Sequence, residues 1–269
     1  MTGFRYDEEI RTTPSGEHTW DGRVHAAWNI GTNPNGGYLL SLAADALRQA
    51  CPGHPDPLSI TVHYLRPGVP DTDCRIRTQR LRAGRTLSTA RATLEQQGEA
   101  RIEVLAAMGD LAGADQPVLV PPPPVLPPPE QCEPRTGEAQ SLMLPILQRL
   151  DIRLAPEEAV PGKAGRPQVT GWIRFRDGRE PDPMACLLFA DTFPPSVMGL
   201  LGNVGWVPTV ELTVQVRHRP APGWMLGQFR TLDFSDGRII EDGALWDSTG
   251  RLVAQARQLA LVRQAERKS

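Results

Sequence analysis

The chain has 269 residues, with 29 Lys and Arg side chains against 31 Asp and Glu, so its formal net charge at pH 7 is −2. This balance argues against a nucleic-acid-binding protein, because such proteins usually carry a strong basic excess. Hydrophobic residues make up 40% of the chain and charged residues 22%, which is typical of a globular protein and not of a disordered one.

The sequence also lacks the usual signals of a membrane, secreted or metal-binding protein. No apolar stretch approaches the roughly 20 residues that a membrane-spanning helix needs. Residues 1–18 have neither the basic nor the apolar region of a signal peptide. The cysteines are widely separated, which disfavours a disulfide framework and a zinc site; they are Cys51, Cys74, Cys132 and Cys186. We therefore expect a cytoplasmic protein without a metal or cofactor.

The first half of the chain predicts one helix among several strands. An extended segment at 19–30 precedes an apolar helix at 36–51, which ends at Pro52. Alternating apolar and polar residues, with glycine at the turns, then predict three strands, at 57–68, 82–94 and 98–108.

A proline-rich segment separates the two halves of the sequence. Nine prolines lie between Pro117 and Pro134. Such a run cannot donate ladder hydrogen bonds or enter a helix, so it predicts an extended connector. We therefore divide the chain into an N-terminal domain at 1–114, a linker at 115–140 and a C-terminal domain at 141–269.

The second half repeats the pattern of the first. Strands are predicted at 148–154 and 168–176, and an apolar helix at 182–201 begins with Asp182 as N-cap and Pro183 at the first helical position. The strands that follow match those of the first half at an offset of 152 or 153 residues over about fifty residues, and lie at 209–223, 235–246 and 250–262.

This internal repeat predicts the fold. Both helices are apolar nearly all round, as expected for helices that other elements enclose. We expect an α+β protein with a tandem, or double, hotdog arrangement, in which two antiparallel sheets each wrap a central helix.

The sequence resembles the acyl-CoA thioesterase II (TesB-like) family of double-hotdog proteins over nearly its whole length. The resemblance rests on the order and spacing of several motifs, which are NGGYLLSLAADAL, HYLRPG, LRAGRTLSTARATL, WIRFRDG, FADTF and GRLVAQARQ. It implies a catalytic Asp in the second helix, a Thr on the next strand and a Gln on the last strand. These correspond to Asp191, Thr209 and Gln258, with Thr213 as the competitor of Thr209.

Asp191 is the lone carboxylate in the apolar stretch CLLFADTF. A buried carboxylate needs donors, because its desolvation is expensive. A Thr hydroxyl and a Gln amide would hold it without an ion pair and leave it basic enough to take a proton from water. The alternative is that Asp191 lies at an exposed helix break beside Pro194 and Pro195.

Gly36 and Gly37 begin the first helix, where free backbone N–H groups and the helix dipole favour an oxyanion or carbonyl group. The alternative is a turn that needs positive φ. The carboxylate of the first helix, Asp45, is expected to be solvated beside Arg48, so we expect one active site per chain.

The function that these observations favour is hydrolysis of an acyl-CoA thioester to a free fatty acid and CoA, by a water that Asp191 activates and that Thr209 and Gln258 hold. A non-catalytic acyl-binding or assembly protein is one alternative, and a hotdog enoyl hydratase or dehydratase is another. The five histidines are dispersed, which weakens the dehydratase hypothesis. The resemblance further implies a homo-oligomer of the double unit.

Overall fold

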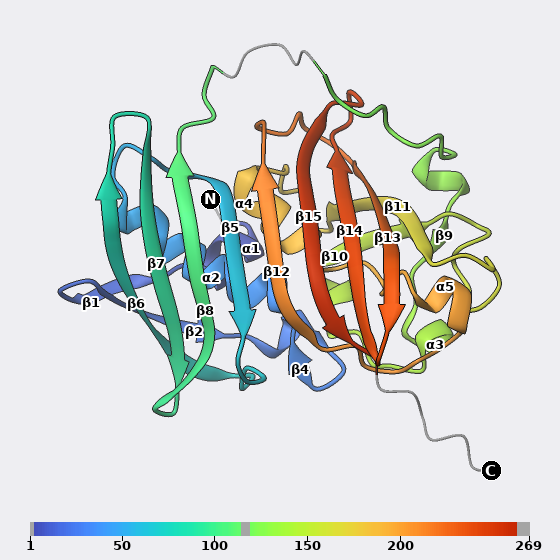
Figure 1. Ribbon diagram of the computed structural model, residues 1–269, viewed down its shortest axis with the longest axis horizontal. Coiled ribbons are helices and arrows are strands. Elements are labelled where there is room, and N and C mark those ends of the chain that lie inside the picture. Colours follow the sequence, from blue (N-terminus) through green and yellow to red (C-terminus); the bar gives the residue numbers. More distant parts are fainter. Residues whose placement is uncertain (1–2, 114–118, 263–269) are drawn as a thin grey trace.

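The computed structural model describes residues 3–113 and 119–262. Their dominant feature is one 13-stranded sheet in which every neighbouring pair is antiparallel (Figure 1). In spatial order the strands are β1 (Thr13–Gly16), β2 (Thr19–Val24), β6 (Thr72–Ala83), β7 (Leu87–Gln96), β8 (Glu99–Gly109), β5 (Asp56–Tyr64), β12 (Thr209–Val216), β15 (Leu252–Leu261), β14 (Arg238–Trp246), β13 (Met225–Ser235), β11 (Gln168–Phe175), β10 (Leu150–Leu154) and β9 (Glu133–Pro134). A small second sheet pairs β3 (Asn29–Ile30) with β4 (Asn33–Pro34).

Two buried helices lie on the same side of the large sheet, α2 (Gly36–Ala50) and α4 (Pro183–Phe189). In Figure 1 they lie behind the strands, where they contact each other; α2 also packs on β5, β6, β7 and β8, and α4 packs on β12 and on β5 of the other half. Short helical segments complete the structure, namely α1 (Arg5–Glu9), α3 (Gly137–Gln140), α5 (Met198–Leu201) and the 3₁₀ turns at Ala26–Trp28, Pro129–Gln131 and Pro145–Gln148. None of the helices in the described ranges is long and apolar enough to cross a membrane.

The two halves of the chain join edge to edge through β5 and β12. Thr61 pairs with Thr213, its equivalent at the repeat offset of 152, and their hydroxyl oxygens are 2.9 Å apart. The expectation of two separate sheets is therefore wrong, since the two repeats form one continuous sheet. Pairing of the two edges satisfies backbone groups that would otherwise stay exposed.

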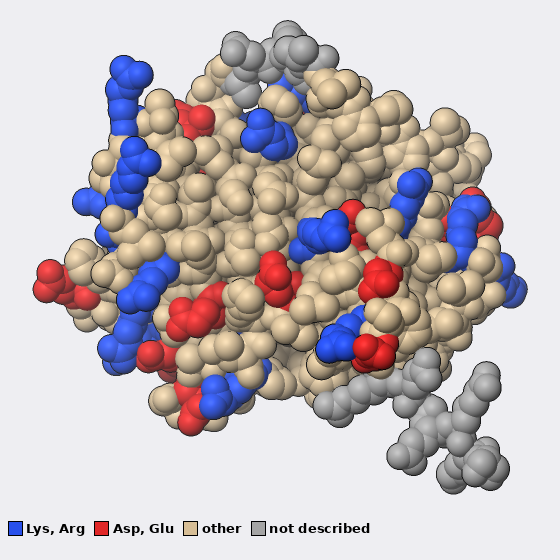
Figure 2. All heavy atoms as spheres, viewed as in Figure 1, with Lys and Arg blue, Asp and Glu red and all other residues tan. Residues whose placement is uncertain are grey.

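The outer face of the sheet carries acidic and basic side chains near one another (Figure 2). Cross-strand ion pairs account for part of this pattern. Arg77 and Glu95 approach to 3.0 Å across β6 and β7, and Arg257 and Asp242 to 3.2 Å across β14 and β15. Such exposed pairs add little stability, but they keep the charge on this face mixed.

The predicted first helix is confirmed, whereas the predicted second helix is wrong in its length. The structure ends α4 at Phe189, and α5 begins only at Met198. Pro194 and Pro195 lie between them, and proline removes a helical hydrogen bond and restricts the residue before it. Asp191 consequently lies in a turn just beyond α4 and not inside a helix.

Within the described residues, the predicted linker at 115–140 is irregular in its first part and structured in its second part. Residues 115–118 lie outside the described residues, and 119–128 have no regular secondary structure. Beyond them, a 3₁₀ turn, β9 and α3 occupy much of 129–140, and β9 pairs with β10 at the end of the sheet.

The expectation that Asp45 is solvated is wrong. The residue is only 2% exposed, because the N-terminal segment covers it. Its Oδ2 accepts hydrogen bonds from the backbone and hydroxyl of Thr12, both within 2.8 Å, and from Gln49 Nε2 at 2.9 Å. Its Oδ1 pairs with Arg48. The helical pattern of the sequence alone could not show that the chain near Thr12 packs against Asp45.

Candidate active site

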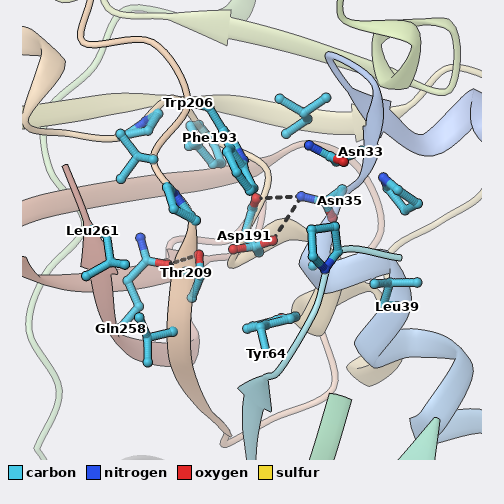
Figure 3. Close-up of a pocket in the computed structure, with 18 of the residues that line it drawn as sticks. Asn33, Asn35, Leu39, Tyr64, Asp191, Phe193, Trp206, Thr209, Gln258 and Leu261 are labelled. Atoms are coloured by element: carbon cyan, nitrogen blue, oxygen red, sulfur yellow. Dashed lines mark hydrogen bonds between the residues drawn. The ribbon is translucent and has the colours of Figure 1, made fainter. Parts of the chain in front are cut away.

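A cavity of about 430 Å³ lies between the two halves of the chain, and its wall comes from both (Figure 3). Apolar side chains form most of this wall, among them Leu39, Leu142, Phe193, Met198 and Phe229. Trp206 and Leu65 are 44% and 48% exposed, so they stand at its opening. Four of the site residues predicted from the sequence line this cavity, namely Gly36, Asp191, Thr209 and Gln258. The fifth, Gly37, does not line it but donates a hydrogen bond to Asp191.

The Asp191 carboxylate is held by the first residues of α2. Its Oδ2 accepts a hydrogen bond from Gly37 N at 2.8 Å and from Asn35 Nδ2 at 2.9 Å. Asn35 Nδ2 also donates to the backbone oxygen of Asp191 at 2.8 Å, while its Oδ1 caps α2 by accepting from Tyr38 N. The N-terminus of a helix from one half thus supports a carboxylate from the other half.

Two expectations about the site need correction. Thr209 and Gln258 do not donate to Asp191 in the described structure, and Asn35 and Gly37 do so instead. The Gly37 N–H is therefore engaged with a carboxylate and not free for a thioester carbonyl. Neither Gly36 nor Gly37 has positive φ.

Glycine at these two positions permits close approach of neighbouring groups. A Cβ on Gly37 would lie 2.8 Å from the backbone oxygen of Leu187 and 3.0 Å from Asp191 Cβ. A Cβ on Gly36 would lie 2.7 Å from the ring of Tyr64. Any side chain here would push the start of α2 away from Asp191, so both glycines determine where the carboxylate is held.

Thr209 and Gln258 belong to a second hydrogen-bond network beside Asp191. Thr209 Oγ1, at the start of β12, donates to Gln258 Oε1 on β15 at 3.1 Å. Gln258 Nε2 donates to Glu241 Oε1 on β14 at 2.9 Å. The other oxygen of Glu241 accepts from the backbone N–H of Ser196 at 2.7 Å and from its hydroxyl. In Figure 3, Asp191 lies between this pair and Asn35.

The competitor Thr213 lies elsewhere. Its hydroxyl contacts Thr61 and donates to Glu211 Oε1 at 2.9 Å, at the junction of the two halves. It does not line the cavity. The geometry therefore favours Thr209 as the hydroxyl of the site.

The Asp191 carboxylate has unusual electrostatics. Its pKa is raised to about 7, first by burial and then by the charge of Glu241, against the hydrogen bonds from Gly37, Asn35 and Gly36, which lower the pKa. Among the described residues, no side chain donates a hydrogen bond to its Oδ1. A carboxylate with a pKa near neutrality and an accessible oxygen can accept a proton from a bound molecule at physiological pH.

The Glu241 carboxylate is also buried, and burial raises its pKa against the hydrogen bonds from Ser196 and Gln258, which lower it. The sequence analysis did not select this residue. Alternation along β14 places Glu241 on the buried side together with Ile239, and that alternation was a usable signal for it. Asn35 was not selected either, although Asn directly before an apolar helix is a preferred N-cap residue.

The described residues of the cavity show no metal-binding character. Within residues 3–113 and 119–262, no group of three or more His, Cys, Asp or Glu side chains is arranged to hold a metal ion. The described residues that line the cavity include no histidine. The polar groups that face bound molecules are therefore carboxylate, amide, hydroxyl and guanidinium groups.

Family models match both halves of the chain. The acyl-CoA thioesterase N-terminal domain matches residues 24–112, and the acyl-CoA thioesterase C-terminal domain matches residues 129–262. The chain belongs to the acyl-CoA thioesterase family. The matches fall on the two repeats that meet at β5 and β12, so the doubled sheet and the family assignment agree.

Individual relatives of this thioesterase-family chain cover nearly all of it. An uncharacterized protein of Mycobacterium tuberculosis is 30% identical in an alignment of 266 positions that covers 90% of this chain and 90% of its own. The solved structure of a "putative thioesterase II" from Thermobifida fusca YX is 31% identical with a TM-score of 0.86 and covers 97% of this chain and 98% of its own. A tesB protein of Mycobacterium avium subs paratuberculosis, at 21% identity, has the same fold with a TM-score of 0.78 over 96% and 98%.

Proposed function

We propose that this thioesterase-family chain hydrolyses acyl-CoA thioesters to a free fatty acid and CoA, with Asp191 as general base. The observation that carries the proposal is the state of its carboxylate. One oxygen is fixed by Asn35 and Gly37, the other has no side-chain donor among the described residues, and the residue lines a mostly apolar cavity. Family membership supports the reaction class.

The chemistry requires a water positioned for attack. Thr209 donates its hydroxyl hydrogen to Gln258, so Thr209 Oγ1 keeps lone pairs that can accept from a water. Gln258 Nε2 uses one N–H on Glu241 and keeps a second. In the proposed reaction these two groups orient a water, and Asp191 Oδ1 takes its proton as the water oxygen attacks the thioester carbonyl.

The reaction then proceeds through a tetrahedral intermediate. The C–S bond breaks as the carbonyl re-forms, and the CoA thiolate leaves and acquires a proton. Asp191, protonated in the first step, is the proton source nearest to that event. A general base of this kind typically contributes about 10²–10⁴-fold to the rate.

Glu241 has a positioning role in this proposal. Because Gln258 Nε2 donates to Glu241, the amide oxygen of Gln258 faces Thr209 and not the reverse. If the Gln258 amide were flipped, its N–H donor would face the O–H donor of Thr209, unless the Thr209 hydroxyl also rotated. Glu241 thus holds the water-orienting pair in one arrangement.

Two alternatives have less support. A hydratase or dehydratase of this fold would need a general acid or base opposite Asp191, and no histidine of the described ranges lines the cavity. A non-catalytic acyl-binding protein would not need a buried carboxylate with an accessible oxygen, which is costly to keep in an apolar site.

A panel of acyl-CoA esters with a thiol-release assay tests the proposal. Hydrolysis is expected for at least one chain length, with kcat/KM rising with pH through about 7 as Asp191 loses its proton. An enoyl-CoA substrate followed by ultraviolet absorbance serves as the matched assay for hydration. Thiol release from no ester in the panel, with acyl-CoA binding retained, would support the non-catalytic alternative.

A further inference from the structure

A buried arginine in the cavity has no carboxylate partner among the described residues. Arg135 follows β9, is 7% exposed and lines the same cavity as Asp191. Its Nε and Nη2 donate to Gln140 Oε1 at 3.1 and 2.8 Å, and its Nη1 donates to the backbone oxygen of Thr192. Every partner within the described ranges is neutral.

This arrangement leaves hydrogen-bonding capacity on the guanidinium. An arginine side chain has five N–H donors, and three hydrogen bonds account for three of them. One N–H on each terminal nitrogen therefore remains without a partner in the described structure. Burial lowers the pKa of Arg135 to about 9, so the group is still charged at neutral pH.

A purely structural role explains only part of this geometry. The bond to Thr192 supports the turn after α4, where a cation is favoured by the helix dipole. That role would be served by one N–H and does not require a buried charge. Buried charges in proteins are normally paired, because desolvation without an opposite charge is expensive.

Gln140, like Arg135, has an unused hydrogen-bond donor at the cavity. Its Oε1 accepts both bonds from Arg135, which leaves its Nε2 as a donor with no partner in the described ranges. Gln140 also lines the cavity, and α3 with its capping residue Thr136 fixes its backbone. Arg135 and Gln140 together present only donors to the cavity.

We propose that Arg135 and Gln140 bind an anionic group of the substrate, and that the group is the terminal carboxylate of an ω-carboxyacyl thioester. This inference rests on the proposed function and specifies its substrate class. A planar carboxylate matches the two unused N–H groups of a guanidinium, which bind such groups in bidentate fashion.

The position of Arg135 favours the acyl chain over CoA as the source of the anion. Arg135 is almost fully buried, whereas Trp206 and Leu65 at the opening are about half exposed. A thioester carbonyl beside Asp191 places the bulky nucleotide toward the opening and the acyl group inside. The apolar wall then contacts the methylene groups, and the cation meets the chain end.

The experiment compares two six-carbon substrates, adipoyl-CoA and hexanoyl-CoA, which differ in a terminal carboxylate. The wild-type chain is expected to prefer adipoyl-CoA in kcat/KM. Arg135→Met, which keeps an unbranched apolar stem and removes the charged guanidinium, is expected to lower the ratio of adipoyl to hexanoyl kcat/KM by about ten- to a hundred-fold. Arg135→Lys keeps the charge and should lose less.

Binding separates this proposal from the proposed hydrolysis. Thioether analogues that cannot be cleaved, S-(5-carboxypentyl)-CoA and S-hexyl-CoA, are titrated into the wild-type chain by calorimetry. Tighter binding of the carboxylated analogue supports the anion site even if no ester is hydrolysed. It also keeps the test decisive if Arg135→Met does not fold, which thermal melting would reveal.

Two results would overturn the proposal. Equal affinity of the wild-type chain for the two analogues would leave Arg135 with a structural role only. Repeating the comparison with dephospho-CoA thioesters covers the other source of an anion. If Arg135→Met weakens CoA thioesters of both acyl groups equally but does not affect their dephospho forms, the cation binds the CoA phosphate and the substrate-class assignment is wrong.

Discussion

The two halves of the molecule each hold an aspartate at their helix, Asp45 buried within α2 and Asp191 half-buried just beyond α4, and the two carboxylates have opposite surroundings. Both oxygens of Asp45 are occupied, Oδ2 by Thr12 and Gln49 and Oδ1 by Arg48. Asp191 has neutral donors on Oδ2, no ion pair with any described residue, and an Oδ1 that no described side chain occupies.

This difference shows that burial of a carboxylate does not by itself indicate chemistry. Asp45 has a cation and several donors as partners, so neither of its oxygens is left to meet a bound molecule. Desolvation and the charge of Glu241 raise the pKa of Asp191 to about 7, and the residue lines the cavity. The hydrogen-bond partners, together with the partial exposure of Asp191 at the cavity, separate the structural aspartate from the candidate general base.

The sharpest test of this comparison is Asp191→Asn. The isosteric amide keeps an acceptor for Asn35 and Gly37 but cannot take a proton, so kcat is expected to fall about 10²–10⁴-fold. The variant should fold normally. Because the pKa of Asp191 is raised from 3.8 to about 7, the folded state binds the extra proton between those values and loses stability as pH rises through that window.

The Asp191→Asn variant has no carboxylate to ionise and so avoids this loss of stability at high pH. Its melting temperature at pH 8 should therefore equal or exceed that of the wild-type chain. Thermal melts at pH 5 and pH 8 check this, beside the thiol-release assay. Retention of more than a tenth of the wild-type kcat would remove Asp191 from the mechanism.

The next largest effect is expected for Gln258→Ala. Loss of the amide removes the group that links Thr209 to Glu241 and orients the water in the proposed reaction. We expect kcat to fall about ten- to a hundred-fold, with a smaller rise in KM, because the group acts in the chemical step. A rise in KM with unchanged kcat would make Gln258 a substrate-binding residue instead.

Asp45→Asn is the counterpart in the first half. It weakens the ion pair with Arg48 and replaces one acceptor oxygen by a donor, so stability should fall by roughly 1–3 kcal/mol. The turnover of the folded enzyme should stay within two-fold, because Asp45 does not line the cavity. Denaturant unfolding and kcat are measured on the same sample; a large loss of kcat without a loss of stability would contradict the division between the two halves.

Glu241→Gln tests the electrostatic part of the comparison. Without the charge of Glu241 the pKa of Asp191 should fall, so the rise of kcat/KM with pH should shift to lower pH by on the order of 0.5–1 unit. Full pH–rate profiles of variant and wild type measure the shift. A profile that moves to higher pH would show that Glu241 does not raise the pKa of Asp191.

The smallest effect is expected for Thr213→Val, with Thr209→Val as its matched partner. Thr213 contacts Thr61 and Glu211 where the halves join, away from the cavity, so kcat should change less than two-fold. Thr209→Val removes the hydroxyl that donates to Gln258 and should reduce kcat clearly more. If the two variants rank in the opposite order, Thr213 is the hydroxyl of the reaction.

The sequence by itself determined the repeat, the presence of an apolar helix within each half and most strand positions. These features depend on local patterns, namely alternation of apolar residues, glycine at turns and proline after a helix. The repeat offset of 152 also relates Thr61 to Thr213, and in the structure these two residues meet at the junction of the sheet. The candidate residues Asp191, Thr209 and Gln258 followed from family motifs, and the structure places all three at one cavity.

Only the tertiary structure decided what holds each of these groups. The donors to Asp191 come from Asn35 and Gly37, more than 150 residues earlier, and Asp45 is covered by a segment 33 residues before it. Hydrogen-bond partners across such separations leave no periodic signal, since they depend on how helices and strands pack and not on neighbouring residues. For the same physical reason the unpaired charge of Arg135 became visible only when α3, β9 and the turn after α4 met at the cavity.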